Sequence, residues 1–531
     1  MQLDEVTAVL AGAVRCPPDG DWSVPIDSLA YDSRAVKPGA LFFCVPGFRS
    51  DGHDYAPQAL ERGAAALVVE RPLRCGVPEL VVADARAAMA AVAAAFFGYP
   101  SRRLRVVGVT GTNGKTTTAF LVRALLEASG QQCGLLGTVK SIVGGRDRDV
   151  ERTTPEAIDL QSDFAEMLAA GDRACAMEVS SHALALRRTA GIEFAAAIFT
   201  NLSRDHLDFH ETMEDYFQAK RRLFIPEAAV LDGAPGGGIP EPPPGVSVVN
   251  IGDAFGARLA DELEDPVTVA VDEPADYSAR ELRVGFGGVA FTLSTPAGQR
   301  EVSSTLRGRF NVANALGAIA TAHKLGGDLD VLVAALERGV SVPGRFEAVD
   351  EGQDFAALVD YAHTPDSLEA VLRAARELGG EERRARVVCV LGAGGDRDRG
   401  KRPVMGEVAT RLADAVIVTS DNPRSEVPEQ IIAEVMAGAS AAVAADARGS
   451  AIAGAAEPLI EAVTDRRAAI ERAIALARPG DVVVVAGKGH EQGQEFADGR
   501  KVPFDDVSAV REALRALPRA RVAGRPARAT A

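Results

Sequence analysis

The sequence lacks the features of several classes of protein. Its six cysteines are scattered and form no C-x-x-C pair, which favours buried thiols in a reducing compartment over a disulfide framework or a zinc site. A formal net charge of −16 argues against a nucleic-acid binder, so an anionic substrate must be held by locally placed Arg and Lys. No apolar run approaches the roughly 20 residues that span a bilayer, and the N-terminus has no secretory pattern. We therefore expect a cytoplasmic protein that neither binds nucleic acid nor inserts into a membrane.

The length of the chain, 531 residues, is too great for a single hydrophobic core and predicts three domains. Composition shifts place an N-terminal domain at 1–102, a central domain at 103–341 and a C-terminal domain at 342–517. Residues 518–531 are basic and Ala-rich, and we expect a disordered tail there.

Apolar strands alternate with helical stretches, which predicts an α/β fold with a doubly wound parallel sheet of the P-loop type in the centre and a Rossmann-like C-terminal domain. Short alternating segments at 281–306 predict an added antiparallel patch. We expect surface insertions at 233–245, which is dense in Pro and Gly, and at 437–456, which consists mostly of small residues. The strands and helices predicted most strongly are the helices 85–97 and 213–224 and the strands 40–45, 174–179, 195–200, 355–359, 386–391, 415–419 and 481–486.

The most informative motif is a glycine loop between an apolar run at 106–109 and a helical stretch at 118–126. Its glycines let backbone N–H groups converge on phosphate oxygens, the lysine adds a full charge, and the threonine after it is placed to bind Mg²⁺. The usual G-x-x-x-x-G-K-[ST] pattern needs a glycine where Val109 stands, which weakens a kinase or GTPase interpretation. A Gly-rich turn that only caps a helix is the alternative, but the Lys-Thr pair in register favours a nucleotide site. The loop consists of Gly111, Thr112, Asn113, Gly114, Lys115, Thr116 and Thr117.

Other polar residues follow predicted strands of the central domain. Glu178 ends one strand and, with Thr116, is suited to hold Mg²⁺, although a helix-capping carboxylate explains it better when it is taken alone. The loop 200–208 combines His, Asp and Arg, and its alternative is an ordinary solvated loop. Lys220 lies in the predicted helix 213–224, where the pattern alone favours an exposed lysine.

Three polar loops follow Val/Ile-rich strands of the C-terminal domain. The carboxyl ends of parallel strands meet at one edge of a sheet, so these loops should converge. Arg397 and Arg424 suit a carboxylate and Glu491 suits an ammonium group, which together describe a site for a zwitterionic amino acid. Taken singly, each loop is explained equally well as a solvated turn. The loops are 392–402, 421–424 and 487–491.

Together these motifs resemble those of the Mur ligases, ATP-dependent amino-acid ligases of peptidoglycan precursor synthesis, from about Asp32 to Phe504. The resemblance implies three domains that bind a UDP-sugar, ATP and the incoming amino acid in that order. It also implies a monomeric cytoplasmic enzyme of cell-wall biogenesis, with ATP as co-substrate and Mg²⁺ as cofactor. Within the family, the chain is similar to the ligases that add meso-2,6-diaminopimelate to a UDP-N-acetylmuramoyl dipeptide.

The resemblance also assigns site residues. Catalytic roles fall to Lys115, Lys220 and His206. ATP would be held by the glycine loop, listed above, together with Asn311, Asn314, Arg345 and Asp360. The UDP-muramoyl dipeptide would contact Ser33, Phe48, Arg49, Ser50, Thr153, Thr154, Ser180 and Arg188. Diaminopimelate would contact Arg397, Asp421, Asn422, Pro423, Arg424, Gly487 and Glu491. Metal ions would be bound by Thr116, Glu178, His206 and Lys220.

Lys220 matches the lysine that this family carbamylates with CO₂, so the resemblance reverses the expectation of an exposed lysine. Arg424 completes the Asp-Asn-Pro-Arg signature of diaminopimelate addition. Diaminopimelate carries a second carboxylate that lysine lacks, and leaving a buried guanidinium unpaired costs roughly 1–3 kcal/mol. Two departures stand out: Leu186 replaces a glutamine among the muramoyl contacts, and 250–253 departs from the usual Asn-Ala-Asp-Asp.

The implied reaction forms an acyl phosphate from the D-glutamyl carboxylate and ATP, which the diaminopimelate amine then converts to an amide. Closure of the domains would bring Arg345 and Asp360 onto the nucleotide. One alternative is a lysine-adding, folate-polyglutamate or other Mur-type ligase, against which Thr153, Thr154 and Arg424 weigh. The other is a nucleotide-binding regulatory or scaffold protein without turnover, which the retained catalytic residues oppose.

Overall fold

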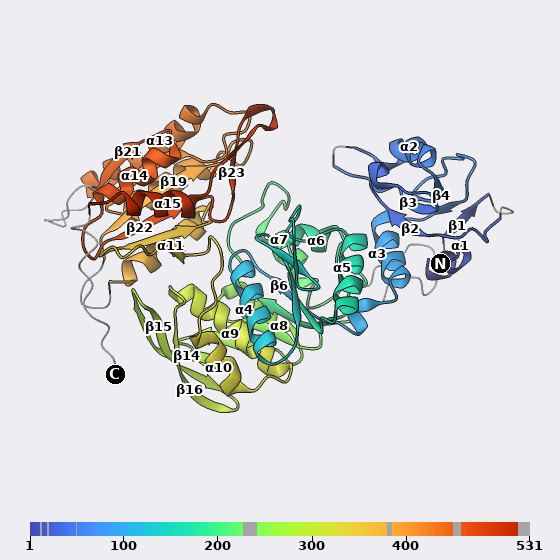
Figure 1. Ribbon diagram of the computed structural model, residues 1–531, viewed down its shortest axis with the longest axis horizontal. Helices are drawn as coiled ribbons and strands as arrows, with labels where there is room; N and C mark the ends of the chain where they lie inside the picture. The colour runs from blue at the N-terminus through green and yellow to red at the C-terminus, as the bar shows by residue number, and fades with distance from the viewer. Residues whose placement is uncertain are drawn as a thin grey trace. The chain divides into compact units, whose positions relative to one another are not determined.

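The computed structural model describes residues 1–10, 13–17, 21–48, 50–226, 242–379, 385–449 and 458–518. Arg49, most of the expected 233–245 insertion and the expected tail beyond Pro518 lie outside these residues. The chain divides into two compact units, each described by itself below. Figure 1 labels the helices and strands. Unit 1 comprises 1–202, 209–268 and 317–332, and unit 2 comprises 203–208, 269–316 and 333–531.

Unit 1 begins with a five-stranded sheet in the order β1-β5-β4-β3-β2. Its strands are β1 (Val14–Cys16), β2 (Ser28–Ala30), β3 (Ala40–Phe43), β4 (Ala64–Val69) and β5 (Glu79–Val81). Only β1 runs antiparallel to its neighbour. Its helices are α1 (Leu3–Val9), α2 (Ala56–Glu61) and α3 (Ala85–Phe96), with short 3₁₀ turns at Ser33–Ala35, Gly52–Tyr55 and Pro100–Arg102. The predicted helix at 85–97 is confirmed, and Asp84 caps it by accepting from Arg86 N and Ala87 N.

The part of the second sheet described with unit 1 has the strand order β12-β11-β6-β10-β7-β8-β9. It is parallel from β12 to β7, and β8 and β9 extend it as antiparallel strands. The doubly wound centre predicted from the sequence is therefore confirmed. The strands are β6 (Arg105–Thr110), β7 (Cys133–Leu136), β8 (Ser141–Val143), β9 (Arg146–Arg148), β10 (Ala174–Glu178), β11 (Phe194–Phe199) and β12 (Ser247–Asn250).

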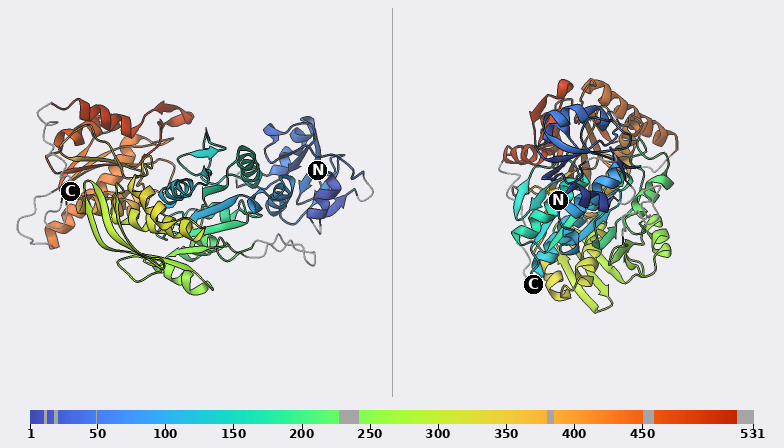
Figure 2. Two further views of the ribbon diagram at one scale, coloured as in Figure 1. Left: turned by 60° about the horizontal axis from the view of Figure 1, so that its bottom comes forward. Right: turned by 90° about the vertical axis from the view of Figure 1, so that its right-hand side faces the viewer.

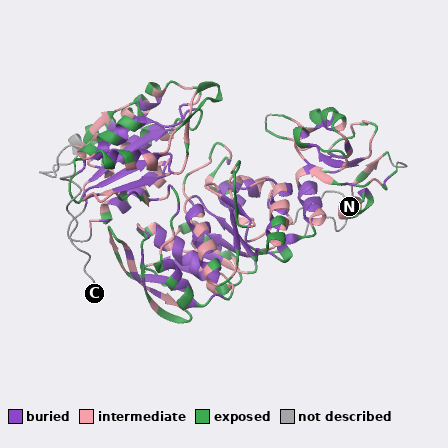
Figure 3. Cartoon of the chain, viewed as in Figure 1, coloured by how far each residue is buried: buried purple, intermediate pink, exposed green. Residues whose placement is uncertain are grey.

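Apolar runs form these central strands because helices cover both faces of a parallel sheet. Every residue of β10 is buried, and Figure 3 shows the same for most of the parallel strands. The associated helices are α4 (Lys115–Ala128), α5 (Ala157–Ala170), α6 (Ser181–Ala185), α7 (Met213–Arg221) and α8 (Ala254–Glu262). The helix predicted at 213–224 ends at Arg221, although Leu223 and Phe224 still pack in the core.

Unit 2 contains the antiparallel patch expected at 281–306, as a curved ribbon of long strands (Figure 2). Its strands are β14 (Tyr277–Gly285), β15 (Gly288–Thr295) and β16 (Gly298–Ser304), and β14 pairs in parallel with β13 (Val267–Val271). The helices α9 (Arg309–Lys324) and α10 (Leu329–Glu337) follow, and residues 317–332 of this stretch belong to unit 1.

The C-terminal sheet of unit 2 has the strand order β17-β18-β22-β19-β20-β21, all parallel except the edge strand β17. Its strands are β17 (Glu347–Ala348), β18 (Ala356–Asp360), β19 (Val387–Ala393), β20 (Ala415–Ser420), β21 (Leu459–Ala462) and β22 (Val482–Ala486). A hairpin of β23 (Gly493–Glu495) and β24 (Lys501–Pro503) lies beyond it, with a 3₁₀ turn at Ala497–Gly499. Separate apolar clusters cover the two faces of the sheet, as a Rossmann-like domain requires.

The helices of this domain are α11 (Pro365–Glu377), α12 (Lys401–Leu412), α13 (Pro428–Gly449), α14 (Arg466–Leu476) and α15 (Asp506–Arg515). The prediction of a surface insertion at 437–456 is wrong for the first part of that segment, because α13 continues to Gly449. Alanine-rich sequence favours a helix, and a side chain at Gly438 would meet Pro403 O at 1.8 Å, so α13 packs closely on α12. In the described part of the chain, no helix is long and apolar enough to cross a bilayer.

Candidate functional site: a phosphate loop and an acceptor cluster

The glycine loop of unit 1 joins β6 to α4, as predicted. Gly111 and Gly114 have φ angles of 145° and 85°, a region that favours glycine. Asn201 supports the loop, because its Oδ1 accepts from Asn113 N at 3.0 Å and its backbone O accepts from Thr112 N at 2.9 Å. Lys115 folds back over the loop, and its Nζ donates to Gly111 O at 2.9 Å and to Thr112 O at 2.7 Å. The loop is thus built as a cationic cradle at a helix N-terminus.

Glu178 lies beside this loop at the end of β10, next to β6 in the sheet. Its Oε2 accepts from Thr116 Oγ1 at 3.0 Å, and its Oε1 accepts from Thr138 N at 2.7 Å. The carboxylate is buried, and a side chain at Gly137 would meet its Oε1 at 2.5 Å. Two hard oxygen donors, from Thr116 and Glu178, are therefore adjacent. Sequence reasoning missed Thr138, which no motif marks.

Lys220 on α7 is buried, with 1% of its surface exposed, so the exposed lysine that its helical pattern favoured is wrong. Its Nζ donates to Gly111 O at 2.7 Å, the same carbonyl that accepts from Lys115. The ammonium also lies 4.5 Å from the centre of the Tyr216 ring, whose hydroxyl accepts from Thr112 Oγ1 at 3.2 Å. Two lysines thus converge on one carbonyl of the phosphate loop.

His206, the third catalytic candidate, belongs to unit 2. Its backbone has a φ of 55°, its side chain is 42% exposed, and its Nε2 lies 3.4 Å from Asp205 Oδ2. The described residues contain no group of three or more His, Cys, Asp or Glu side chains suited to hold a metal ion.

The residues expected to contact the muramoyl dipeptide cluster beside Glu178. Thr154 Oγ1 donates to Glu178 O at 2.9 Å and accepts from Ser180 N at 3.1 Å, and Thr153 Oγ1 accepts from Thr138 Oγ1 at 3.1 Å. Arg188 Nη1 donates to Thr154 O at 3.2 Å. Four of the predicted residues therefore lie together.

Burial lowers the pKa of the Arg188 guanidinium, and the carboxylate of Glu156, 2.9 Å away, opposes that shift. Leu186, which stands where the family often has glutamine, is the C-cap residue of α6.

The expected uridine contacts divide into a pocket and an exposed side chain. Ser33 and Ser50 line a pocket of about 600 Å³ in unit 1, where Ser33 Oγ donates to Gln58 Oε1 at 2.6 Å. Phe48 is 78% exposed and contacts Phe209, with ring centres 5.7 Å apart. Arg49 is outside the described residues. Sequence reasoning missed other residues of this pocket, Arg86, Arg152 and Glu156 among them.

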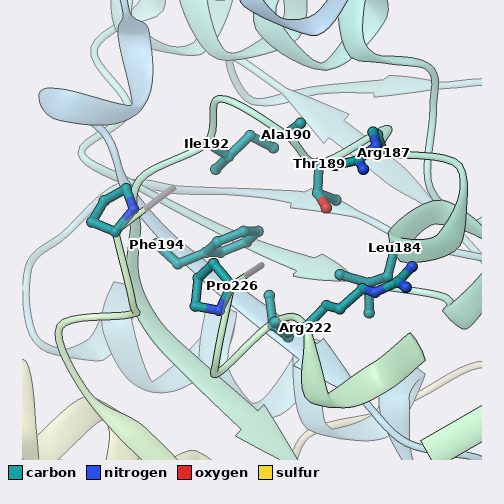
Figure 4. A pocket seen from close by; sticks show the side chains of 10 residues that line it. Leu184, Arg187, Thr189, Ala190, Ile192, Phe194, Arg222 and Pro226 are labelled. Carbon is teal, nitrogen blue, oxygen red and sulfur yellow. The ribbon is translucent and has the colours of Figure 1, made fainter. Parts of the chain in front are cut away.

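Figure 4 shows a second pocket of unit 1, beside α6. Leu184, Ile192 and Phe194 line it with Thr189, and Arg222 reaches into it. Its volume of about 30 Å³ has room for a water molecule but not for a substrate.

The residues expected near adenine and ribose lie in unit 2. Asn311 and Asn314 are buried on the first turns of α9, and Asn314 Nδ2 donates to Asn311 Oδ1 at 3.1 Å. Asp360 ends β18 and accepts from Phe346 N at 2.6 Å and from Ala362 N at 2.7 Å. Burial raises the pKa of Asp360, and the positive charge of Arg345 opposes that shift. The Arg345 guanidinium lies 4.5 Å from the centre of the Tyr361 ring.

The acceptor loops of unit 2 converge as predicted. Asn422 Nδ2 donates to Glu491 Oε2 at 2.7 Å, which joins the loop after β20 to the loop after β22. Gly487 has a φ of 116°, and a side chain there would meet Asp421 Oδ2 at 2.7 Å, so glycine is required. Lys488, which sequence reasoning quoted but gave no role, is fully buried between these loops.

The two arginines expected at the acceptor carboxylate also lie close together. A side chain at Gly394 would meet Arg424 Nη1 at 3.2 Å and Arg397 Cγ at 3.9 Å. Arg424 is partly buried, and it donates from Nε to Glu495 Oε2 at 3.0 Å and from Nη1 to Gly395 O at 2.7 Å. Pro423 packs on the glycine turn, because a side chain at Gly395 would meet Pro423 O at 1.9 Å. Arg397 is exposed.

Three family models match the chain. They are the Mur ligase family catalytic domain at 25–102, the Mur ligase middle domain at 109–322 and the Mur ligase glutamate ligase domain at 344–489. The chain belongs to the Mur ligase family. The phosphate loop at 111–117 falls in the middle-domain match, and the acceptor loops fall in the C-terminal match as far as residue 489.

Curated relatives of this Mur ligase match nearly its whole length. The UDP-N-acetylmuramoyl-L-alanyl-D-glutamate–2,6-diaminopimelate ligase of Syntrophomonas wolfei is 44% identical over 94% of this chain and 96% of its own. The enzyme of the same name from Streptomyces coelicolor is 46% identical over 94% of each chain. A solved structure of a ligase with this name is 32% identical, covers 97% of this chain and 99% of its own, and has a TM-score of 0.65.

Proposed function

We propose that this Mur ligase is an ATP-dependent, ADP-forming amide ligase that adds meso-2,6-diaminopimelate to UDP-N-acetylmuramoyl-L-alanyl-D-glutamate in the cytoplasm. The observation that supports this most strongly is that relatives of this name match 94% of the chain at 44–46% identity. The domain boundaries at 102/103 and 341/342 and a monomeric state are part of this proposal.

The phosphate loop suits the first step of the reaction. An oxygen of the D-glutamyl carboxylate attacks the γ-phosphorus of ATP, the bond to the leaving ADP oxygen breaks, and an acyl phosphate forms. Lys115 and the loop N–H groups neutralise the charge that builds on the transferring phosphoryl group, which is mainly a positioning and electrostatic task. Thr153, Thr154, Ser180 and Arg188 would hold the muramoyl dipeptide beside this loop.

The residues present fit a bound Mg²⁺. Thr116 Oγ1 and Glu178 Oε2, 3.0 Å apart, are hard oxygen donors at the phosphate loop. When bound there, Mg²⁺ would withdraw charge from the phosphate oxygens. Within unit 2, His206 is the remaining metal candidate, and Asn311, Asn314, Arg345 and Asp360 are the candidates for adenine and ribose.

Lys220 fits a carbamate on chemical grounds. A neutral amine adds CO₂ and releases a proton, which turns a cationic side chain into an anionic one that can ligate Mg²⁺. Lys220 is buried and donates to the same carbonyl oxygen as Lys115, so two positive charges lie close to one hydrogen-bond acceptor. Conversion of one of them to an anion removes that repulsion.

The acceptor loops suit the second step. The diaminopimelate amine attacks the acyl carbon, the tetrahedral intermediate loses phosphate, and the amine loses a proton as the amide forms. Arg397 and Arg424 would bind the distal carboxylate, and Glu491, Asp421 and Asn422 the distal ammonium. Pro423 and Gly487 would fix the shape of the loops. A lysine acceptor would leave the guanidinium groups without their carboxylate.

The test is ADP release with the UDP-muramoyl dipeptide and ATP, measured with meso-diaminopimelate, L-lysine or no acceptor. We expect release that depends on diaminopimelate and exceeds the rate with lysine by at least about 100-fold. A preference for lysine would identify a lysine-adding ligase, and no release with any pair would identify a binding protein without turnover.

A further inference from the structure

Lys488 lies at the centre of the acceptor loops, although the proposed function gives it no role. Its side chain is fully buried, which is rare for a lysine unless its charge is satisfied. Its Nζ donates to Asn422 Oδ1 at 2.9 Å and to Glu491 Oε2 at 2.9 Å, and it lies 3.5 Å from Asp421 Oδ1. An ammonium group has three N–H donors, and each of them faces a different residue of the predicted diaminopimelate site.

We propose that Lys488 is a positioning residue for acceptor recognition, which orients Asn422, Asp421 and Glu491 toward the distal end of diaminopimelate. This inference rests on the proposed function. Lys488 is buried beneath these residues and would act on the acceptor only through them.

The contacts fix the orientation of the Asn422 amide. Its Oδ1 accepts from two donors, Lys488 Nζ and Glu495 N, the latter at 3.0 Å, while its Nδ2 donates to Glu491 Oε2. The reversed amide would place its NH₂ group against two donors and its oxygen against a carboxylate. Lys488 also holds Glu491 Oε2, so the carboxylate that would meet the acceptor ammonium is anchored at one oxygen.

Cations and carboxylates are paired around Lys488. Lys488 meets the carboxylates of Asp421 and Glu491, and Arg424 meets that of Glu495. A cluster with both signs at fixed positions matches a zwitterion, such as the distal end of diaminopimelate. Without Lys488 the cluster would lose a positive charge and would favour an acceptor that ends in an ammonium group alone.

A buried ion pair holds the base of this arrangement. Arg466 donates to Asp506 from Nε at 2.8 Å and from Nη2 at 2.6 Å, and both side chains are fully buried. Arg466 Nη2 also donates to Ala486 O at 3.0 Å, at the end of β22. This ion pair therefore holds the end of β22, which leads into Gly487 and Lys488. The position of the Lys488 ammonium is thus set by the fold.

The experiment compares Lys488→Met with Lys501→Met, the same substitution at an exposed lysine of the same domain. We expect Lys488→Met to raise the KM for diaminopimelate by about 10–100-fold, as the loss of charge-assisted hydrogen bonds predicts. The KM for ATP and for the UDP-muramoyl dipeptide should stay within about threefold of the parent, and the ratio of diaminopimelate to lysine turnover should fall. Lys501→Met should match the parent in every constant.

The outcomes separate the two proposals. If the parent enzyme shows no diaminopimelate-dependent ADP release, the proposed function fails. If the parent does and Lys488→Met leaves the diaminopimelate KM unchanged, or shifts all three KM values alike, the inference about Lys488 is wrong.

Should Lys488→Met lose its cooperative thermal transition, the same constants are read from Lys488→Gln, whose amide keeps two donors without the charge. We expect a smaller rise, confined to diaminopimelate. Failure of both variants to fold would make Lys488 a structural residue only and would also overturn the inference.

Discussion

The phosphate loop of unit 1 and the acceptor loops of unit 2 each contact a buried lysine, but the two lysines meet different kinds of partner. At the phosphate loop, Lys115 and Lys220 donate to the same carbonyl, Gly111 O, at 2.9 and 2.7 Å. At the acceptor loops, Lys488 and Arg424 each meet a carboxylate, at 2.9 and 3.0 Å. In the first region two ammonium groups share one carbonyl, and in the second each cation meets a carboxylate.

This difference indicates what each region is built to bind. Two converging ammonium groups repel each other, and a bound polyanion or a change of one lysine to an anion relieves that repulsion. A set of paired charges offers no net attraction to an ion of one sign, but it recognises a molecule that carries both signs in the right places. The comparison therefore supports the proposal that the first region handles phosphate chemistry and the second selects the acceptor.

The largest effect should come from Lys220→Ala, which breaks the first half of the comparison. We expect turnover to fall by about 10³-fold with every acceptor, because the phosphoryl-transfer site loses a charge-bearing group. A small added carboxylate should restore part of the activity, since it can occupy the volume of a carbamate. Lys324→Ala, at an exposed lysine of α9, is the matched control and should retain full ADP release.

A second readout of Lys220 does not depend on activity. After exposure to ¹³CO₂, the parent protein should show a carbamate carbonyl signal by NMR that Lys220→Ala lacks and Lys324→Ala keeps. Unchanged turnover in Lys220→Ala, or the same signal in that variant, would reject the carbamate role.

The phosphate loop could be predicted from the sequence because its residues are contiguous. Strand, glycine loop and helix follow one another at 106–126, and the loop geometry depends on those residues and on Asn201. The adjacency of Glu178 and Thr116 was also within reach, since both follow neighbouring parallel strands. Burial of Lys220 was not, because the pattern of α7 does not show which of its polar residues faces the loop.

The location of the acceptor site could be predicted from the sequence, but the hydrogen bonds within it could not. Strand ends on one sheet edge brought the loops at 421 and 487 together, as expected. The role of Lys488 depends on which donors meet which acceptors, and sequence neighbours do not specify that. The same holds for Arg152 and Glu156, which line the pocket near Ser33 although no motif marks them.

A smaller effect should come from Arg424→Ala, which tests the second half of the comparison. Loss of a charge-assisted hydrogen bond should lower kcat/KM for diaminopimelate by about 10–100-fold, while the rate with lysine stays within about threefold. The contrast with Lys220→Ala is the point of the test, because that variant should affect all acceptors alike. Arg411→Ala, at an exposed arginine of α12 paired with Glu407, is the control. Equal losses with both acceptors would remove Arg424 from acceptor choice.

The smallest expected effect concerns how the thermal stability of unit 2 changes as the pH falls. His363 is half-buried beside Tyr361, with ring centres 4.6 Å apart. Burial lowers its pKa below the ordinary value of 6.5, and the charge of Lys401 acts in the same direction. The unfolded chain therefore binds a proton at a pH where the native chain does not. Stability from this group is complete above pH 6.5 and declines as the pH falls through the lowered native value.

We therefore expect the Tm of His363→Gln to fall less than that of the parent between neutral and mildly acidic pH, by about 1–3 °C. His323→Gln, a histidine of α9 in unit 1, is the matched control and should keep the slope of the parent. Thermal unfolding followed at several pH values in one buffer series measures both variants. If His363→Gln instead steepened the decline of Tm with falling pH, the His363 imidazole would be protonated in the native state. An unbalanced cation would then lie beside the acceptor loops, contrary to the charge pairing inferred there.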